Sequence, residues 1–91
     1  MSGQLYHYLI CYDIADPRRL NRVGRVSRQQ ALALQYSVYY LFGTAADLDR
    51  LLDRLDALID VEVDDIRAYR IPELGRVERQ GESWLPDGVF G

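Results

Sequence analysis

Hydrophobic residues occur along the chain in stretches whose spacing alternates between strand-like and helix-like. The run from Leu5 to Ile14 is rich in Tyr, Ile and Leu without helical spacing, which predicts a central strand buried on both faces. Leu32 to Phe42 is again strand-like, and a break near Gln35 to Ser37 leaves open whether it forms one strand or two. Ile66 to Ile71, which Pro72 ends, predicts a further strand.

Two helices are predicted between these strands. Asp16 is suited to cap the first helix, and Pro17 takes the first helical position, where its missing N–H costs nothing. Thr44 can cap the second helix. The second helix has an apolar stripe about 120° wide that is formed by Leu48, Leu51, Leu52, Leu55, Leu58 and Ile59. We expect this stripe to face the sheet.

The first predicted helix has an apolar side and a basic side. The residues spaced to share its inner side are Leu20, Val23, Ser27 and Ala31. Arg18, Arg22 and Arg25 fall within a sector of about 60° on the other side, which is either a solvated face or a phosphate-binding surface. Gly24 weakens the helix by about 1 kcal/mol relative to Ala, and we expect it to mark close approach of a neighbouring backbone.

The order of these elements predicts an α+β fold. Strand, helix, strand region, helix and strand fit a βαββαβ sandwich over residues 1–75, in which two helices cover one face of an antiparallel sheet. Arg76 to Gln80 is a candidate C-terminal edge strand, and bulky residues follow it at Trp84, Leu85, Val89 and Phe90. We expect residues 76–91 to pack on the partner protomer of a homodimer or on another protein. A tail folded over its own core, or a disordered tail, is the alternative.

Composition narrows the class of protein. A chain of 91 residues with 48% hydrophobic residues can bury a single core. No run approaches the roughly 18 to 20 apolar residues of a membrane span, and the N-terminal residues lack a signal-peptide pattern, so we expect a soluble, cytoplasmic protein without membrane association. Cys11 is the only cysteine, so it forms no internal disulfide and we expect it to be a small buried residue.

Charge is unevenly distributed, although the formal net charge is only −3. Residues 17–46 contain five arginines and no acid, whereas residues 47–65 contain eight acids against Arg50 and Arg54. All eleven basic residues are arginines, whose planar guanidinium groups suit phosphate, although an arginine-rich genome would produce the same bias. The chain therefore combines a basic element with an acidic one, and the two could serve separate partners.

Asp13 is the candidate metal ligand, because it ends an apolar strand just before the arginine-rich helix. One carboxylate is a weak Mg²⁺ site, since this ion requires octahedral oxygen coordination. Two copies that brought their Asp13 side chains together could hold one Mg²⁺ and activate a water against a phosphodiester. The alternative is a solvated strand end. The chain contains no glycine-rich phosphate loop, no His/Cys cluster and no Ser-His-Asp set, and its sole histidine, His7, lies in the first strand.

Several short motifs follow one another between about Leu5 and Pro72. They are Tyr12-Asp13-Ile14 with Asp16, Arg18 to Val23, Gln35 to Tyr39, Leu58 to Asp60, and Asp64 to Tyr69. Together they resemble the CRISPR-associated protein Cas two family. The resemblance implies a ferredoxin-like homodimer whose C-terminal strand crosses to the partner's sheet. It also implies a role in CRISPR adaptation, in which the dimer holds duplex DNA between two dimers of the Cas one integrase. Some members are described as Mg²⁺-dependent endonucleases acting on RNA or DNA.

The resemblance also assigns roles to individual residues. It implies that Asp13 is the metal-ligand aspartate and that Ser37 belongs with it to the nuclease site. Arg18 and Arg19 match the basic start of the family's first helix, where phosphate contacts are expected. The chain departs from many relatives at Ala31 to Leu34, where they carry a Gly-x-Arg-Val pattern before the glutamine, and at Tyr39, where a Phe is usual. The absent arginine removes a charge that could steady a scissile phosphate.

Three functions are therefore weighed. The first is a nuclease with a divalent cation, Mg²⁺, between paired Asp13 side chains. The second is an architectural protein that binds duplex DNA through Arg18, Arg22 and Arg25 and needs no metal. The third class comprises a toxin-type, VapD-like endoribonuclease and a non-catalytic ferredoxin-like regulatory module. Besides duplex DNA, single-stranded RNA is an expected partner of the CRISPR-type protein. We favour a homodimeric CRISPR adaptation protein that binds DNA and has metal-dependent endonuclease activity as a further property.

Overall fold

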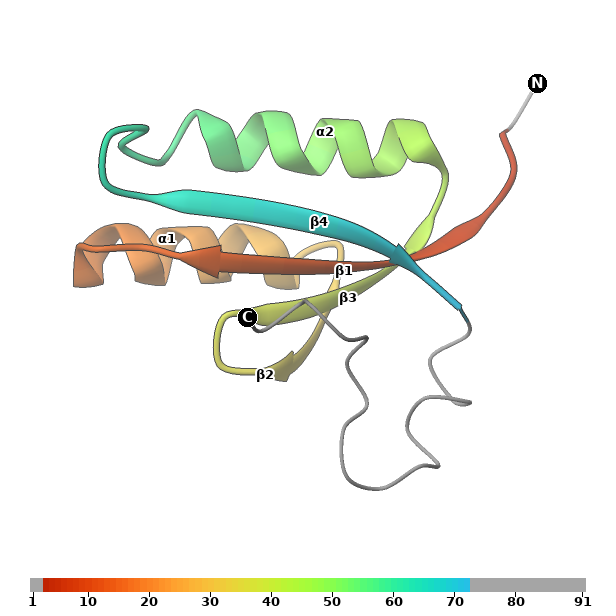
Figure 1. Cartoon of the computed structure of the whole chain (residues 1–91), viewed down its shortest axis with the longest axis horizontal. Coiled ribbons are helices and arrows are strands. Elements are labelled where there is room, and N and C mark those ends of the chain that lie inside the picture. The colour runs from red at the N-terminus through yellow and green to blue at the C-terminus, as the bar shows by residue number, and fades with distance from the viewer. Residues whose placement is uncertain (1–2, 73–91) are drawn as a thin grey trace.

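The computed structural model describes residues 3–72, which form a four-stranded antiparallel sheet and two helices (Figure 1). The elements are β1 (Tyr6–Asp13), α1 (Pro17–Arg28), β2 (Leu32–Gln35), β3 (Val38–Gly43), α2 (Ala45–Asp56) and β4 (Asp65–Ile71). The strand order β2-β3-β1-β4 with these connections is the ferredoxin-like βαββαβ topology, as predicted. The expected C-terminal strand and the bulky tail residues lie outside the described residues.

β1 lies at the centre of the sheet and pairs antiparallel with both β3 and β4. Successive side chains of a strand point to opposite faces, so Leu9 and Ile10 lie on different faces. Both side chains are 0% exposed. The prediction of a central strand buried on both faces is therefore confirmed.

The predicted capping residues begin both helices. The Asp16 carboxylate accepts a hydrogen bond from the Arg19 backbone N–H at 3.0 Å, and Pro17 follows as the first helical residue. At α2, Thr44 Oγ1 accepts from the Asp47 N–H at 3.0 Å, and Asp47 Oδ2 accepts from the Thr44 N–H at 2.9 Å. This reciprocal capping box satisfies two N–H groups that the helix itself leaves without acceptors, and such a cap contributes about 1 kcal/mol. The bond from the Thr44 N–H lowers the pKa of Asp47.

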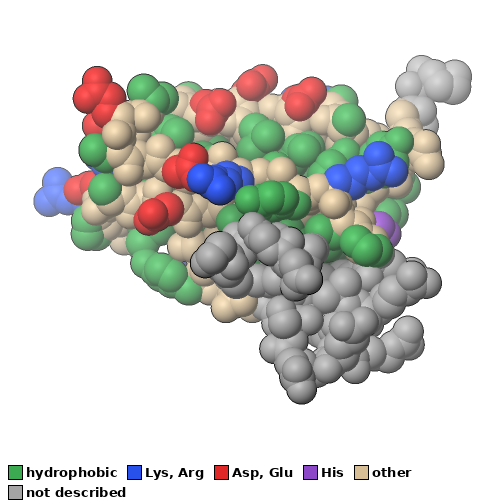
Figure 2. Space-filling view, in the orientation of Figure 1, with side chains coloured by type: hydrophobic (Ala, Val, Ile, Leu, Met, Phe, Trp, Pro, Cys, Tyr) green, Lys and Arg blue, Asp and Glu red, His purple; other side chains and the backbone are tan. Residues whose placement is uncertain are grey.

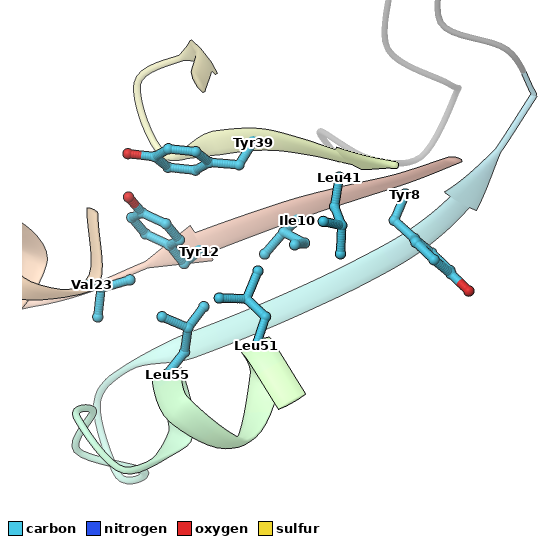
Figure 3. Packing of buried hydrophobic residues seen from close by; sticks show 8 residues of the cluster. All are labelled: Tyr8, Ile10, Tyr12, Val23, Tyr39, Leu41, Leu51 and Leu55. Carbon is cyan, nitrogen blue, oxygen red and sulfur yellow. The ribbon is translucent and has the colours of Figure 1, made fainter. Parts of the chain in front are cut away.

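The main core lies between the helices and one face of the sheet. It comprises Tyr8, Ile10 and Tyr12 of β1, Val23 of α1, Tyr39 and Leu41 of β3, and Leu51 and Leu55 of α2 (Figure 3). Leu51 and Leu55 are 0% exposed, and burial of a leucine side chain contributes roughly 1.5–3 kcal/mol. The leucine stripe of the second helix therefore faces the sheet, as predicted.

The ends of three helices or strands differ from, or are more closely defined than, those expected from the sequence. The strand region from Leu32 onward is two strands, joined by the turn at residues 36–37. α1 ends at Arg28, so Ala31 lies beyond its inner face. α2 ends at Asp56, because the hydrogen-bond spacing changes after it. The Ala57 N–H still donates to the carbonyl four residues back, at Asp53, but the Leu58 N–H donates to the carbonyl only three residues back, at Leu55. Leu58 still packs on the main core from outside the helix.

The sheet face opposite the helices, here called the open face, carries a second apolar cluster. Leu9, Val38 and Ile71 are buried there. Cys11 packs against this cluster but is half-buried rather than fully buried as expected, and its burial raises the pKa of the thiol. His7 lies near the start of the same strand, with Nδ1 2.6 Å from the Tyr40 hydroxyl oxygen. No helix within residues 3–72 is long and apolar enough to cross a membrane.

Candidate functional site

Asp13 is the last residue of β1 and its side chain is exposed. It pairs in register with Asp65, the first residue of β4. Directly opposed residues of antiparallel strands share a face, so both carboxylates project from the open face. Asp65 is already engaged, since its Oδ2 accepts from Arg67 Nε at 2.7 Å. The strand ends therefore offer two neighbouring carboxylates, one of which a guanidinium partly neutralises.

These two carboxylates do not form a complete metal site in one protomer. Within residues 3–72, no cluster of three or more His, Cys, Asp or Glu side chains could hold a metal ion. Mg²⁺ in proteins retains several waters and binds through one or two carboxylates together with substrate phosphates. The donor set of Asp13 and Asp65 thus fits Mg²⁺ as a partial site, which a second carboxylate-bearing chain or a phosphate would have to complete.

Ser37 lies beside the strand that ends at Asp13. Its carbonyl accepts a hydrogen bond from the Tyr12 N–H at 3.1 Å, which joins the β2–β3 turn to the end of β1. Its φ of 66° is in the left-handed region, where a residue with a Cβ is strained by roughly 1–2 kcal/mol. Tertiary contacts therefore hold the turn in a conformation that the residue itself disfavours. The fold brings the two predicted nuclease residues to the same end of β1.

Arg18, Arg22 and Arg25, here called the arginine row, are exposed along α1. Residues spaced by three or four positions on a helix are neighbours on its surface. The helix has no acidic residue in its first turn, and Arg25 and Arg28 lie in its last turn. Within residues 3–72, no member of the arginine row forms a salt bridge. These guanidinium groups are positioned to meet phosphate at the surface.

Arg19 has a different environment from the arginine row. Its Nε donates to Asp64 Oδ2 at 2.8 Å, and its Nη2 donates to Asp64 Oδ1 at 3.3 Å. The Asp64 side chain is 0% exposed and also accepts from the backbone N–H groups of Ala15 and Asp60. The hydrogen bond from Arg19 holds the pKa of Asp64 well below its usual range. Arg19 thus ties the start of α1 to the segment before β4.

Two features of the structure were not predicted from the sequence. Asp64 was counted with the acidic segment 47–65, because nothing in its local sequence distinguishes a buried carboxylate from exposed ones. A pocket of about 480 Å³ between α1 and the β2–β3 hairpin, here called the Gly24 pocket, was also missed. Its lining includes Tyr12, Gly24, Arg28, Gln35, Tyr36 and Tyr39. A glycine inside a helix was the one signal for it.

Gly24 does mark a close approach, but not of a backbone as expected. A Cβ at this position would lie 3.2 Å from the Tyr39 hydroxyl oxygen and 3.4 Å from that of Tyr12. The next neighbour is Nη1 of Arg28, at 3.6 Å. The small residue therefore makes room for two phenol groups, whose rings stack with centroids 5.7 Å apart.

The chain is similar in sequence to proteins of one family. The family model described as "CRISPR associated protein Cas2" matches residues 6–77. A Nitrosomonas europaea protein named "CRISPR-associated endoribonuclease Cas2 1" is 43% identical over 82 residues, which cover 90% of this chain and 78% of that protein. A Thermodesulfovibrio yellowstonii protein named "CRISPR-associated endoribonuclease Cas2 2" is 40% identical over 83 residues, which cover 90% of this chain and 91% of that protein.

Solved structures show the same fold. Cas2 of Streptococcus pyogenes, crystallised at pH 6.5, superposes with a TM-score of 0.71 and 27% identity, covering 85% of this chain and 96% of that chain. The hypothetical protein TT1823 from Thermus thermophilus superposes with a TM-score of 0.73 and 24% identity, covering 77% of this chain and 85% of that chain. The second likeness bears on the fold alone.

Proposed function

Because the chain belongs to the CRISPR-associated protein Cas2 family, we propose that it acts in CRISPR adaptation as a homodimer that binds duplex DNA. In this role the dimer would bridge two dimers of the Cas one integrase and hold the DNA between them. The proposal requires a surface that binds phosphate without reading bases, and a face on which two copies can meet.

The observation that carries DNA binding is the arginine row of α1. Guanidinium groups bind phosphate oxygens through charge-assisted, often bidentate, hydrogen bonds. Acidic side chains gather instead along the edge of the molecule where α2 lies (Figure 2). α1 carries arginines and no acid, whereas α2 carries four aspartates and two arginines. An approaching phosphate backbone therefore meets positive charge at α1 although the whole chain is acidic.

The open face supports pairing of two copies. Phe42, which pairs with His7 on this face, leaves 51% of its large apolar side chain exposed beside the buried cluster of Leu9, Val38 and Ile71. Asp13 lies at the end of the same face. A twofold axis across this face would place the same surface of each copy against the other. Such a pair would carry one copy of α1, and hence one arginine row, on each of its two outer sides.

DNA binding is tested by fluorescence anisotropy with a labelled duplex in the presence of EDTA. Arg22→Gln should weaken binding, whereas Arg70→Gln, which removes an exposed arginine of β4 that lies over the Tyr6 ring, serves as the matched control. Equal losses in both variants would show that net charge, not the arginine row, is responsible. Sedimentation of the free protein reports the dimer, and a monomer at micromolar concentration would contradict that part of the proposal.

Phosphodiester hydrolysis is a second candidate function. It is favoured by the position of Ser37 beside the end of β1 that carries Asp13, and by the endoribonuclease names of the two relatives. Mg²⁺, when bound, would polarise the phosphate and lower the pKa of a water. Asp13 of each copy would hold the cation, and the Ser37 hydroxyl would donate to a phosphate oxygen. A guanidinium of the arginine row would hold the adjoining phosphate.

Hydrolysis is tested with single-stranded RNA and duplex DNA at millimolar Mg²⁺. Asp13→Asn should abolish cleavage of either substrate while leaving the circular dichroism spectrum and duplex binding in EDTA unchanged. Asp53→Asn, which neutralises an exposed carboxylate on α2, is the matched control. Cleavage by Asp13→Asn at the wild-type rate would reject hydrolysis at this residue and leave the DNA-binding proposal intact.

A further inference from the structure

The Gly24 pocket lies on the side of the sheet that the helices cover, since Tyr12 and Tyr39 belong to the main core. Asp13 projects instead from the open face. The pocket lies between α1 and the β2–β3 hairpin, whose residues line it together with Tyr12. Its volume of about 480 Å³ is within the range of small-molecule sites. The pocket therefore lies on the other side of the sheet from the carboxylates proposed for hydrolysis, although Ser37, proposed to contact a phosphate there, also lines it.

Three polar groups from three elements converge on the pocket wall at Gly24. They are the hydroxyls of Tyr12 and Tyr39 and the guanidinium of Arg28, all within 3.6 Å of the place where a Cβ would stand. Figure 3 shows the two rings one above the other with both hydroxyls at the same end, the end that lies near Gly24 of α1. A side chain of any size at position 24 would occupy this space.

These groups are suited to an anion. Burial and a hydrogen bond with Tyr39 raise the pKa of Tyr12, so its hydroxyl stays protonated at neutral pH. Two hydroxyls that bond to each other use one of their two protons, which leaves one O–H to donate elsewhere. With the guanidinium of Arg28 beside it, the pair forms a compact set of donors for phosphate oxygens, and Arg25 adds a second positive charge at the pocket lining.

The other part of the lining is suited to a base. Tyr36 is 79% exposed, an unusual position for a large aromatic side chain, and it lies in the strained β2–β3 turn. Exposed aromatic rings are the stacking platforms that proteins use for unpaired bases. Asn21 and Gln35 also line the pocket, and their amides can both donate and accept hydrogen bonds to a base edge.

We propose that the Gly24 pocket binds an unpaired nucleotide, either free or at the phosphorylated end of a single strand. Its base stacks on Tyr36, and its phosphate is bound by Arg28 and the two tyrosine hydroxyls. This inference goes beyond duplex binding by the arginine row, because a base paired within a duplex cannot enter a pocket of this kind. It also needs neither Mg²⁺ nor Asp13.

The test is isothermal titration calorimetry of the full chain in EDTA with adenosine monophosphate (AMP) and a 5′-phosphorylated adenosine trinucleotide. Binding of AMP alone identifies a free nucleotide as the ligand, and binding of the trinucleotide alone identifies a strand end. Tyr36→Ala and Arg28→Gln should each weaken binding by about fivefold or more, whereas Tyr36→Phe should retain it. Arg70→Gln, remote from the pocket, should bind as the wild type does.

Gly24→Ala tests whether a partly filled pocket loses binding in a protein that is still folded. Alanine favours the helix, so the variant should remain folded while its added methyl group reduces binding of the same two probes. Absence of binding of both probes to the wild type would overturn the proposal. So would inorganic phosphate binding as tightly as AMP, or equal losses in Arg28→Gln and Arg70→Gln. Because duplex DNA and Mg²⁺ are absent, each of these results is independent of the proposed adaptation and hydrolysis roles.

Discussion

Arg19 and Asp64 form a salt bridge between the first turn of α1 and the segment that leads into β4, with Nε 2.8 Å from Oδ2. The Asp64 carboxylate also accepts hydrogen bonds from the backbone N–H groups of Ala15 and Asp60. One buried side chain therefore connects the segment before α1, the first turn of α1 and the loop before β4. Removing one partner of such a network leaves the remaining donors unsatisfied, which costs more than the net contribution of the bond itself.

Asp64→Asn should lower the melting temperature by about 5 °C or more, because an amide has one acceptor oxygen in place of two and its NH2 group would face N–H donors. The matched control is Asp65→Asn, which breaks an exposed salt bridge with Arg67 and should change the melting temperature little. Thermal denaturation at neutral pH makes the comparison. Equal shifts in the two variants would contradict a structural role for the buried carboxylate.

Stability should fall in acid, and Asp64 should account for part of the fall. The bond from Arg19 holds the pKa of Asp64 below its value in the unfolded chain. Its contribution is therefore complete above about pH 4 and is lost as the pH falls toward the lower, folded-state pKa. Asp47, whose pKa is also lowered, acts in the same direction. Melting temperatures measured between about pH 5 and pH 2 should decline less steeply for Asp64→Asn than for the wild type.

Gly43→Ala should destabilise the fold by about 1–2 kcal/mol. A Cβ at this position would stand 2.7 Å from Asp47 Oδ2, so the Asp47 side chain must move and the α2 capping box is broken. Gly24→Ala is the comparison, since its contacts begin at 3.2 Å and the helix gains propensity. Urea denaturation measures both variants, and a Gly43→Ala variant as stable as Gly24→Ala would show that the capping box tolerates the added methyl group.

Ser27→Ala should stabilise the protein by about 1 kcal/mol. Ser27 is 0% exposed in the inner face of α1, and its hydroxyl has no hydrogen-bond partner among the described residues. Alanine removes this buried polar group and has the higher helix propensity. The free energy of unfolding from urea titration tests the expectation. A loss of stability would indicate that the hydroxyl has a partner in solution.

Replacement of all three members of the arginine row with glutamine should flatten the salt dependence of DNA binding. Each lost phosphate contact reduces the slope of log K against log salt concentration by about 0.9 for duplex DNA. Anisotropy titrations at several NaCl concentrations give the slope for the wild type and the triple variant. Identical slopes would show that α1 does not contact the phosphates.

The sequence by itself determined the helices, the strands and much of the core, because the capping residues and apolar spacings that predict them act between residues a few positions apart. Asp16 and Pro17 begin α1, Thr44 begins α2, and the leucine spacing of α2 predicts the face that packs on the sheet. The apolar run around Leu9 likewise predicts a strand buried on both faces, as the structure shows. The ends of the helices and the turn at Ser37 were less well determined, since they depend on where the chain must reverse to pair its strands.

Only the tertiary structure decided how neighbouring arginines differ. Arg18 and Arg19 are equivalent in sequence, yet one is exposed in the arginine row and the other is bonded to Asp64, 45 residues away along the chain. The Gly24 pocket likewise requires the register that sets Tyr12 and Tyr39 side by side under α1. Such contacts depend on distances between residues that are far apart in the sequence. Sheet register and helix packing set these distances, and the spacing of residues along the chain does not predict them.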